Sequence, residues 1–135
     1  MDSKKYTYLS GPMTGIEHFN HWSFNEAAAH LRFMGMKVWS PAEHDVGKVE
    51  PYEDVAVLPD PLYNKLLAED LDVIRDQCDS MVMLPGWQFS KGARAERNLA
   101  ISLGYNCFEL CDLGLFLKVP EYLSVSGRTP ELVSA

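Results

Sequence analysis

The sequence has no long apolar run and few cysteines. No segment approaches the roughly 20 consecutive apolar residues of a membrane span, and no such run follows the lysines near the N-terminus. The three cysteines are an odd number without a metal-type CxxC pair. We therefore expect a soluble cytoplasmic protein that contacts no membrane and whose thiols, Cys78, Cys107 and Cys111, are reduced and buried.

Clustered positive charge and metal-ligand spacing are also missing. The chain carries 12 Lys and Arg against 19 Asp and Glu, a formal net charge of −7, and its basic residues are scattered. A nucleic-acid polymer binds to a basic surface that neutralises its phosphates, so we expect no such partner. A single nucleotide is not excluded, because backbone N–H groups at loops and helix N-termini bind phosphate. We expect neither a metal nor a cofactor, since no ligand spacing relates His18, His21, His30 and His44.

What the sequence does contain is typical of one globular domain. Its 135 residues are 47% hydrophobic and 23% charged, which is ordinary composition for a single core. A chain of this length buries roughly two thirds of its unfolded surface, so no disulfide or structural metal is needed. We expect residues 1–135 to form one domain, with a core over about 6–110 and a less regular C-terminal extension over 111–135.

Strand-like and helix-like segments alternate along the core. Strands are predicted at Tyr6–Ser10, Met36–Ser40, Cys78–Leu84 and Tyr105–Leu110, and helices at Trp22–Phe33, Tyr63–Gln77 and Lys91–Leu103. This order predicts right-handed crossovers and an α/β fold of three layers, Rossmann-like, with a mainly parallel sheet. The polar stretch Glu43–Pro61 is interpreted as a long surface loop, with a lid over a ligand site as a hypothesis.

Two loops leave the carboxyl ends of predicted strands, where ligands bind in such folds. In the first loop, Gly11–Gly15, the glycines permit close approach of the backbone to a ligand, and hydroxyl groups can donate hydrogen bonds to it. In the second loop, Gly86–Ser90, Ser90 either caps the next helix or places the N-terminus of that helix on a phosphate. A common turn and a simple cap are the alternatives. The candidate substrate-binding residues are Ser10, Gly11, Pro12, Met13, Thr14, Gly15, Gly86, Trp87, Ser90 and Gly92.

Glu96 is the most informative residue of the chain. Its neighbours on the same helical face are small or apolar, namely Gly92, Ala93, Leu99, Ala100 and Leu103. Burial of a carboxylate on the helical face that packs against the sheet costs free energy unless another group pairs with the carboxylate. This placement therefore indicates a functional role for Glu96. A buried structural acid is the alternative.

Asp70 repeats this pattern on the preceding helix, where Tyr63, Leu66, Leu67 and Ile74 share its face. Its acidic neighbour Asp72 lies three residues before Arg75 and has an ordinary surface pair available. Two carboxylates at one strand-end rim can divide the roles of nucleophile and proton donor. Cleavage at an anomeric carbon needs this division.

The aromatic residues divide between core and loop. Trp22, Trp39, Trp87, Phe19 and Phe89 are expected in the core by default. Trp87 and Phe89 fall in a predicted loop, so stacking on a nucleobase is the alternative for these two.

Four segments together resemble the nucleoside 2-deoxyribosyltransferase-like superfamily, over roughly Tyr6–Leu110. These are YLSGPMTG, FNEAAAHLRFMGMKVWSPAEH, the ED–L helix that ends in CD, and LPGW followed by QFSKGARAERNLAISLGY. The motifs GPMTG and LPGWxxSxGAxxE are similar to those of a small, mostly uncharacterised branch of this superfamily that is frequent in phages and prophages.

The resemblance implies roles for individual residues. The superfamily's nucleophile is a glutamate in a GxxxE helix, which falls on Gly92 and Glu96, and its helix aspartate falls on Asp70. Transferases carry an aspartate six positions before the nucleophile, whereas this chain has Ser90, which is similar to the nucleotide N-hydrolase branch. There a serine and the first glycine loop bind a 5′-phosphate, although the loop here lacks the arginine of some hydrolases.

The function expected from residues and resemblance together is hydrolysis of the N-glycosidic bond of a (deoxy)nucleoside 5′-monophosphate. Glu96 would be the nucleophile and Asp70 its partner. A deoxyribosyltransferase and a protein that binds or sequesters a nucleotide derivative without turnover are the alternatives. Because active sites of this superfamily are often completed by a neighbouring subunit, a homodimer or larger homo-oligomer is also implied.

Overall fold

The protein is built around one six-stranded sheet. The computed structural model describes residues 5–13, 16–44, 60–110, 116–118 and 131–132. Strands β1 (Tyr6–Ser10), β2 (Val38–Trp39), β3 (Cys78–Met83) and β4 (Asn106–Leu110) are parallel, in the order β2-β1-β3-β4. Strands β5 (Phe116–Lys118) and β6 (Glu131–Leu132) extend it antiparallel beyond β4.

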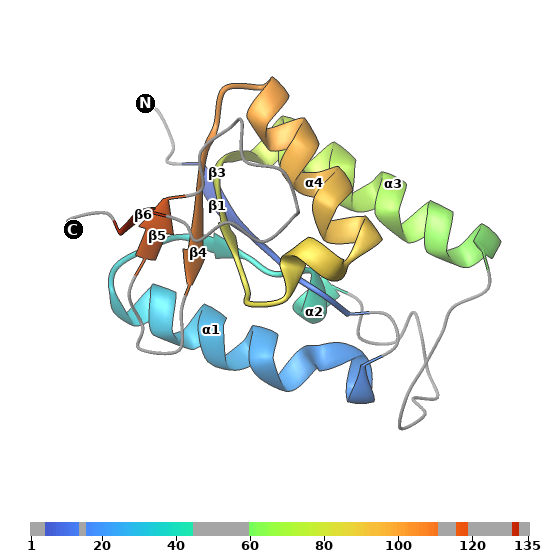
Figure 1. The fold of residues 1–135 in the computed structure, drawn as a ribbon, viewed down its shortest axis with the longest axis horizontal. Helices are drawn as coiled ribbons and strands as arrows, with labels where there is room; N and C mark the ends of the chain where they lie inside the picture. The colour runs from blue at the N-terminus through green and yellow to red at the C-terminus, as the bar shows by residue number, and fades with distance from the viewer. Residues whose placement is uncertain (1–4, 14–15, 45–59, 111–115, 119–130, 133–135) are drawn as a thin grey trace.

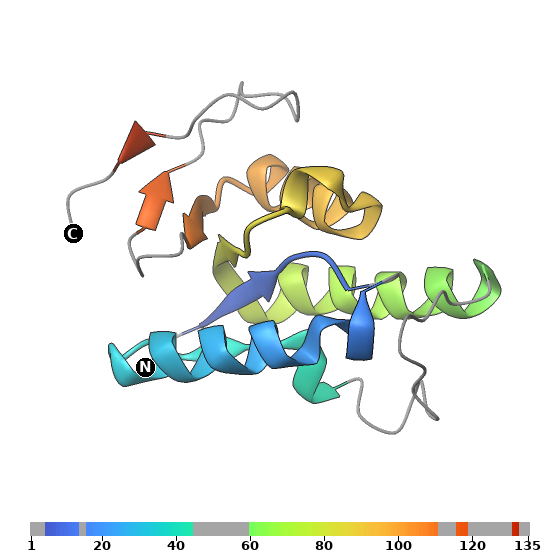
Figure 2. The ribbon, with the colours of Figure 1, turned by 60° about the horizontal axis from the view of Figure 1, so that its bottom comes forward.

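Helices cover both faces of this sheet, which confirms the predicted three-layer Rossmann-like α/β fold. Helix α1 (His21–Phe33) lies on one side, whereas α3 (Asp60–Gln77) and α4 (Lys91–Ser102) lie side by side on the other (Figure 1). Figure 2 shows the same arrangement, with α1 in front of β1 and α3 behind it. This arrangement follows from right-handed crossovers, since the order places β2 and β3 on opposite sides of β1.

The central strand β3 shows why its sequence lacks polar alternation. Met81 and Met83 pack in the core layer beneath α3 and α4, together with Tyr8, and Val82 packs in the layer beneath α1, together with Leu9. Helices on both faces of the sheet bury Met81, Val82 and Met83, whereas Asp79 near the start of β3 is exposed. The neighbouring strand β1 behaves in the same way, because its successive residues Tyr8 and Leu9 pack in different layers.

Local signals place most helix ends correctly. The Ser90 hydroxyl accepts a hydrogen bond from the Ala93 N–H at 3.1 Å, so Ser90 is the predicted N-cap of α4. Gly35 and Gly104 follow α1 and α4 with φ of 92° and 83°, a left-handed conformation that glycine adopts without strain.

The predicted Glu43–Pro61 loop is wrong at both ends. Pro41–His44 forms the short helix α2, and α3 begins at Asp60 rather than at Tyr63. Pro41 and Pro61 lie in first helical turns, where proline is tolerated because the missing N–H has no partner there. The remainder of the loop, 45–59, lies outside the described residues, and so does its interpretation as a lid.

Two further expectations need correction. Trp22 and Phe89 are 72% and 86% exposed, whereas Trp39, Trp87 and Phe19 are buried as expected. Trp22 is the second residue of α1, on the side away from the buried Phe24, and the packing direction of one residue near a helix start is not set by periodicity. The extension after 110 also contributes strands β5 and β6 to the sheet. Strand β2 is shorter than predicted.

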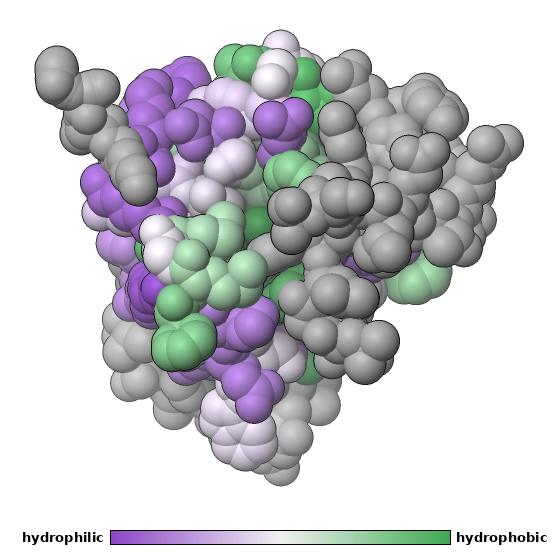
Figure 3. Space-filling model, turned by 90° about the vertical axis from the view of Figure 1, so that its left-hand side faces the viewer, coloured by the Kyte–Doolittle hydropathy of each residue, from purple (hydrophilic) through white to green (hydrophobic). Residues whose placement is uncertain are grey.

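The surface beside β5 and β6 mixes polar and apolar groups. Seen from the left-hand side of Figure 1, green apolar residues of the described surface lie among purple hydrophilic ones (Figure 3). No helix of the described residues is both long enough and apolar enough to cross a membrane.

Cys78 and Cys107 are buried, and neither is part of a disulfide among the described residues, whereas Cys111 lies outside them. Burial raises the pKa of Cys78 to about 12, with the negative charge of Asp79 as a smaller cause. At pH 8 a thiol of that pKa is a thiolate in roughly one molecule in ten thousand. In a Cys111→Ser variant at pH 8 we therefore expect no thiol that reacts rapidly with a disulfide reagent until the protein is unfolded. A fast-reacting thiol in the native variant would contradict the buried placement.

Candidate functional site

The carboxyl ends of β1 and β3 lie side by side, which confirms the predicted shared rim. The Leu84 N–H donates to the Ser10 carbonyl at 2.8 Å. A Cβ built on Gly86 would lie 3.6 Å from Cγ of Pro12. The loops that follow these strands are therefore in contact, and a ligand held by one of them meets the other.

The Glu96 carboxylate lies at this rim, between α4 and β1. Its side chain is 6% exposed. The Ser10 hydroxyl donates to Oε1 at 2.6 Å, and the Tyr8 hydroxyl donates to Oε2 at 3.0 Å. Tyr8 and Ser10 are two residues apart on β1, so both side chains point to the same face of the sheet, the face that α4 covers.

Tyr8 is itself held by a stack of rings. The Tyr8 and Trp39 rings lie 5.5 Å apart between centroids, at 13°, and Trp39 stacks in turn on His44 at 4.0 Å and 10°. Ring stacking restricts the tilt of the Tyr8 ring and so fixes the position of its hydroxyl. The orientation of Glu96 therefore depends on packing between β1, β2 and α2.

Tyr63 of α3 places a third hydroxyl near Glu96. Its oxygen is buried and has no hydrogen-bond partner among the described residues. Burial raises the pKa of Tyr63, the charge of Glu96 raises it further, and Arg94 opposes the shift. A Cβ built on Gly92 would lie 3.1 Å from this oxygen, and Nζ of Lys91 lies 5.0 Å from the ring centroid. The sequence analysis named Tyr63 only as a residue on the face of Asp70; its helical position is equally typical of core packing.

Asp70 is half-buried on α3, on the same side of the sheet as Glu96. It lines an open pocket of about 250 Å³ together with Trp39, His44, Glu69, Val73 and Gln77. Trp39 links this pocket to the Glu96 cluster, since it also stacks on Tyr8. The two predicted acids are therefore on neighbouring helices of one layer, with Glu96 bonded to β1 and Asp70 at a pocket lined by residues of β2, α2 and α3.

Several predicted substrate-binding residues have structural tasks in the described rim. A Cβ on Gly11 would lie 2.8 Å from Cβ of Leu84, so glycine is required there by packing, a reason the sequence analysis did not consider. Ser10 is fully buried and donates to Glu96. The Pro12 carbonyl accepts a hydrogen bond from Asn20 at 2.9 Å. Met13 packs partly against the apolar core. Thr14 and Gly15 lie outside the described residues.

Trp87 points into the core rather than toward a ligand. It is 1% exposed, and the Arg97 guanidinium lies 5.1 Å from its ring. Burial lowers the pKa of Arg97 and raises that of Glu109, and the nearby Trp87 indole opposes the latter shift. The short helix η2 (Trp87–Phe89) turns Trp87 inward and Phe89 outward, so of the two loop aromatics only Phe89 presents its ring to solvent.

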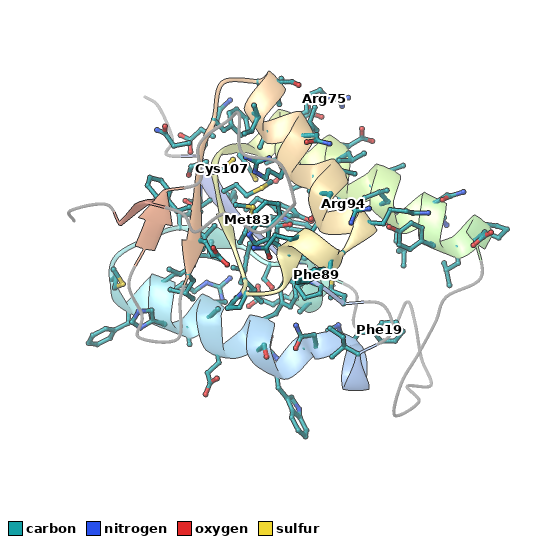
Figure 4. The ribbon with its side chains drawn as sticks, in the orientation of Figure 1. Phe19, Arg75, Met83, Phe89, Arg94 and Cys107 are labelled. Atoms are coloured by element: carbon teal, nitrogen blue, oxygen red, sulfur yellow. The ribbon has the colours of Figure 1, made fainter. Side chains whose placement is uncertain are left out.

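The second loop is tied to the helix that carries Glu96. Arg94 donates to the Gln88 carbonyl at 3.1 Å, and Arg94 and Phe89 lie at the same end of α4 (Figure 4). Gly86 has a φ of 90°, which only glycine adopts readily, and it forms the turn before Trp87.

Among the described residues no group of histidine, cysteine or acidic side chains could hold a metal ion.

A family model described as a domain of unknown function (DUF4406) matches residues 5–108. The chain belongs to this family. The match contains Tyr8, Ser10, Tyr63 and Glu96, so the whole hydroxyl–carboxylate cluster lies within the DUF4406 domain, and β5 and β6 lie beyond it. No curated protein matches the sequence.

Tyr8 and Tyr63 offer a matched pair of substitutions in the DUF4406 domain. Tyr8→Phe removes a donor from a buried carboxylate, which costs about 1.5–3 kcal/mol of unfolding free energy for a hydrogen bond to a charged group. Tyr63→Phe removes a hydroxyl that has no described partner, so we expect an unchanged or slightly larger unfolding free energy. Urea denaturation of both variants measures the difference. Equal losses in the two proteins would contradict the hydrogen-bond assignment.

Proposed function

We propose that the protein hydrolyses the N-glycosidic bond of a nucleoside 5′-monophosphate, with Glu96 as the nucleophile. One observation carries this proposal, namely the buried carboxylate that two hydroxyls orient at the carboxyl-end rim of a parallel sheet. Ligands of such folds bind at this rim. The resemblance of the GxxxE helix to that of the nucleoside 2-deoxyribosyltransferase-like superfamily supports the same reaction.

Glu96 attacks C1′ on the face opposite the base. A bond forms between its carboxylate oxygen and C1′ as the C1′–N bond breaks, and the base leaves with the bonding electron pair and takes up a proton. Water then attacks C1′, loses a proton, and releases the sugar phosphate and the carboxylate, as in retaining glycosidases. Tyr8 and Ser10 position the carboxylate throughout, since their hydrogen bonds restrict its rotation.

The first turn of α4 forms the proposed binding site for the 5′-phosphate. Ser90 caps this helix through its oxygen, which leaves its own O–H free to donate. The backbone N–H groups at a helix start lack partners within the helix and attract anions. Lys91 adds positive charge at the same place. Ser90 stands where transferases of the resembled superfamily carry an aspartate, which favours water over a second base as the acceptor.

Asp70 is the proposed partner of Glu96 and contacts the sugar or assists protonation of the leaving base. Its place in the pocket beside Trp39 supports this role, because Trp39 packs directly on the ring that positions Glu96. The two carboxylates differ in environment, since Glu96 is bonded to two hydroxyls and Asp70 lines an open pocket. Such differences allow one acid to be a nucleophile and the other to handle a proton.

Glu96→Gln tests the nucleophile. Removal of a covalent nucleophile lowers turnover by roughly a thousandfold or more, so we expect base release from a panel of nucleoside monophosphates, followed by chromatography, to fall to background. Glu26→Gln is the matched control, because Glu26 is exposed on α1, across the sheet from α4. Tight binding of an unchanged nucleotide without any free base would favour a binding protein. Base exchange only in the presence of a second base would indicate a transferase.

Asp70→Asn tests the partner acid. We expect kcat/KM for base release to fall at least about tenfold, the lower range for loss of a general acid or base. Asp72→Asn is the control on the same helix, since Asp72 is exposed. Its Oδ1 lies 3.3 Å from Nη1 of Arg75, in the predicted ion pair. The assignment of Asp70 fails if both variants retain the activity of the unaltered protein.

A further inference from the structure

The Tyr63 hydroxyl is a buried polar group that no described residue satisfies. Its oxygen is shielded from solvent and has no hydrogen-bond partner among the described residues. A buried hydroxyl without a partner is costly, and phenylalanine would fill the same space without that cost. The arrangement indicates that the missing partner belongs to a ligand.

The surroundings of this oxygen place that ligand. It lies against Gly92, the residue one helical turn before Glu96, and it is close enough to Glu96 for the carboxylate charge to act on it. Because Gly92 has no side chain, the hydroxyl can approach the start of α4 closely, and a Cβ on Gly92 would lie only 3.1 Å from it. The Tyr63 hydroxyl therefore lies between the proposed phosphate-binding site at the start of α4 and the proposed nucleophile.

We propose that the Tyr63 hydroxyl donates a hydrogen bond to the 2′-hydroxyl of the substrate and makes the site prefer ribose to 2′-deoxyribose. The proposal rests on the proposed function, which sets C1′ of the sugar at Glu96. A nucleophile that attacks C1′ opposite the base approaches the face that carries the ribose 2′- and 3′-hydroxyls. The 2′-hydroxyl is on the carbon next to C1′, so a donor beside Glu96 meets it first.

Two features suit Tyr63 to this role. Burial and the charge of Glu96 hold its pKa above the ordinary value, so the phenol stays protonated and can donate at neutral pH. Its ring is also held in place, with Nζ of Lys91 5.0 Å from the ring centroid. A site that carries a buried hydrogen-bonding group discriminates against an analogue that lacks the matching hydroxyl.

The test measures the affinity of a product, so it does not depend on turnover. Calorimetric titrations compare ribose 5-phosphate with 2-deoxyribose 5-phosphate on the unaltered protein and on Tyr63→Phe. We expect the unaltered protein to bind the ribose form about three- to tenfold more tightly, the range of one neutral hydrogen bond. Tyr63→Phe should lose this preference and bind the deoxy form with unchanged affinity.

Tyr105→Phe is the matched control, because the Tyr105 hydroxyl bonds the Ile74 carbonyl at 2.9 Å near the opposite end of α3. It should keep the ribose preference. The inference is overturned if neither sugar phosphate binds the unaltered protein, if the unaltered protein and Tyr63→Phe show the same preference, or if Tyr63→Phe weakens both sugars equally. A Tyr63-dependent preference without any base release would reject the proposed hydrolysis and leave the sugar contact standing. Base release with no such preference would reject the sugar contact alone.

Discussion

The burial of one carboxylate governs the arrangement of this site. Glu96 is on the face of α4 that packs against the sheet, where an acid is tolerated only if hydrogen-bond donors meet it. Tyr8 and Ser10 supply those donors from β1, a strand more than eighty residues away in the chain. The contact between α4 and β1 is therefore polar at its centre and apolar around it.

This requirement explains much of the nearby packing. Tyr8 has to keep its hydroxyl at the carboxylate, and the stack of Trp39 and His44 holds its ring. Ser10 has to lie at the strand end beside Leu84, which is possible because Gly11 leaves room for the Leu84 side chain. The same closeness of β1 and β3 brings their two loops into contact at the rim.

Tyr8 and Tyr63 differ in how their hydroxyls are satisfied within the described residues. The Tyr8 hydroxyl is satisfied by Glu96, so it has a task within the folded protein. The Tyr63 hydroxyl is equally sheltered yet has no described partner, and it packs closely against Gly92. In the proposed reaction the first group orients the nucleophile and the second recognises the sugar.

The sequence by itself determined the parallel α/β architecture, the Ser90 cap and the presence of an acid on the inner face of α4. These features depend on spacing along one segment, such as apolar residues at helical intervals or glycine after a helix, and spacing is readable from one chain. It misplaced the ends of the Glu43–Pro61 segment, where prolines begin helices, and it placed Trp22 in the core. Only the tertiary structure decided which groups meet Glu96, why Gly11 lacks a side chain, and that Trp87 is buried in the core. Those contacts join β1, α3 and α4 across long stretches of sequence, and no local pattern records which residues two separate segments bring together.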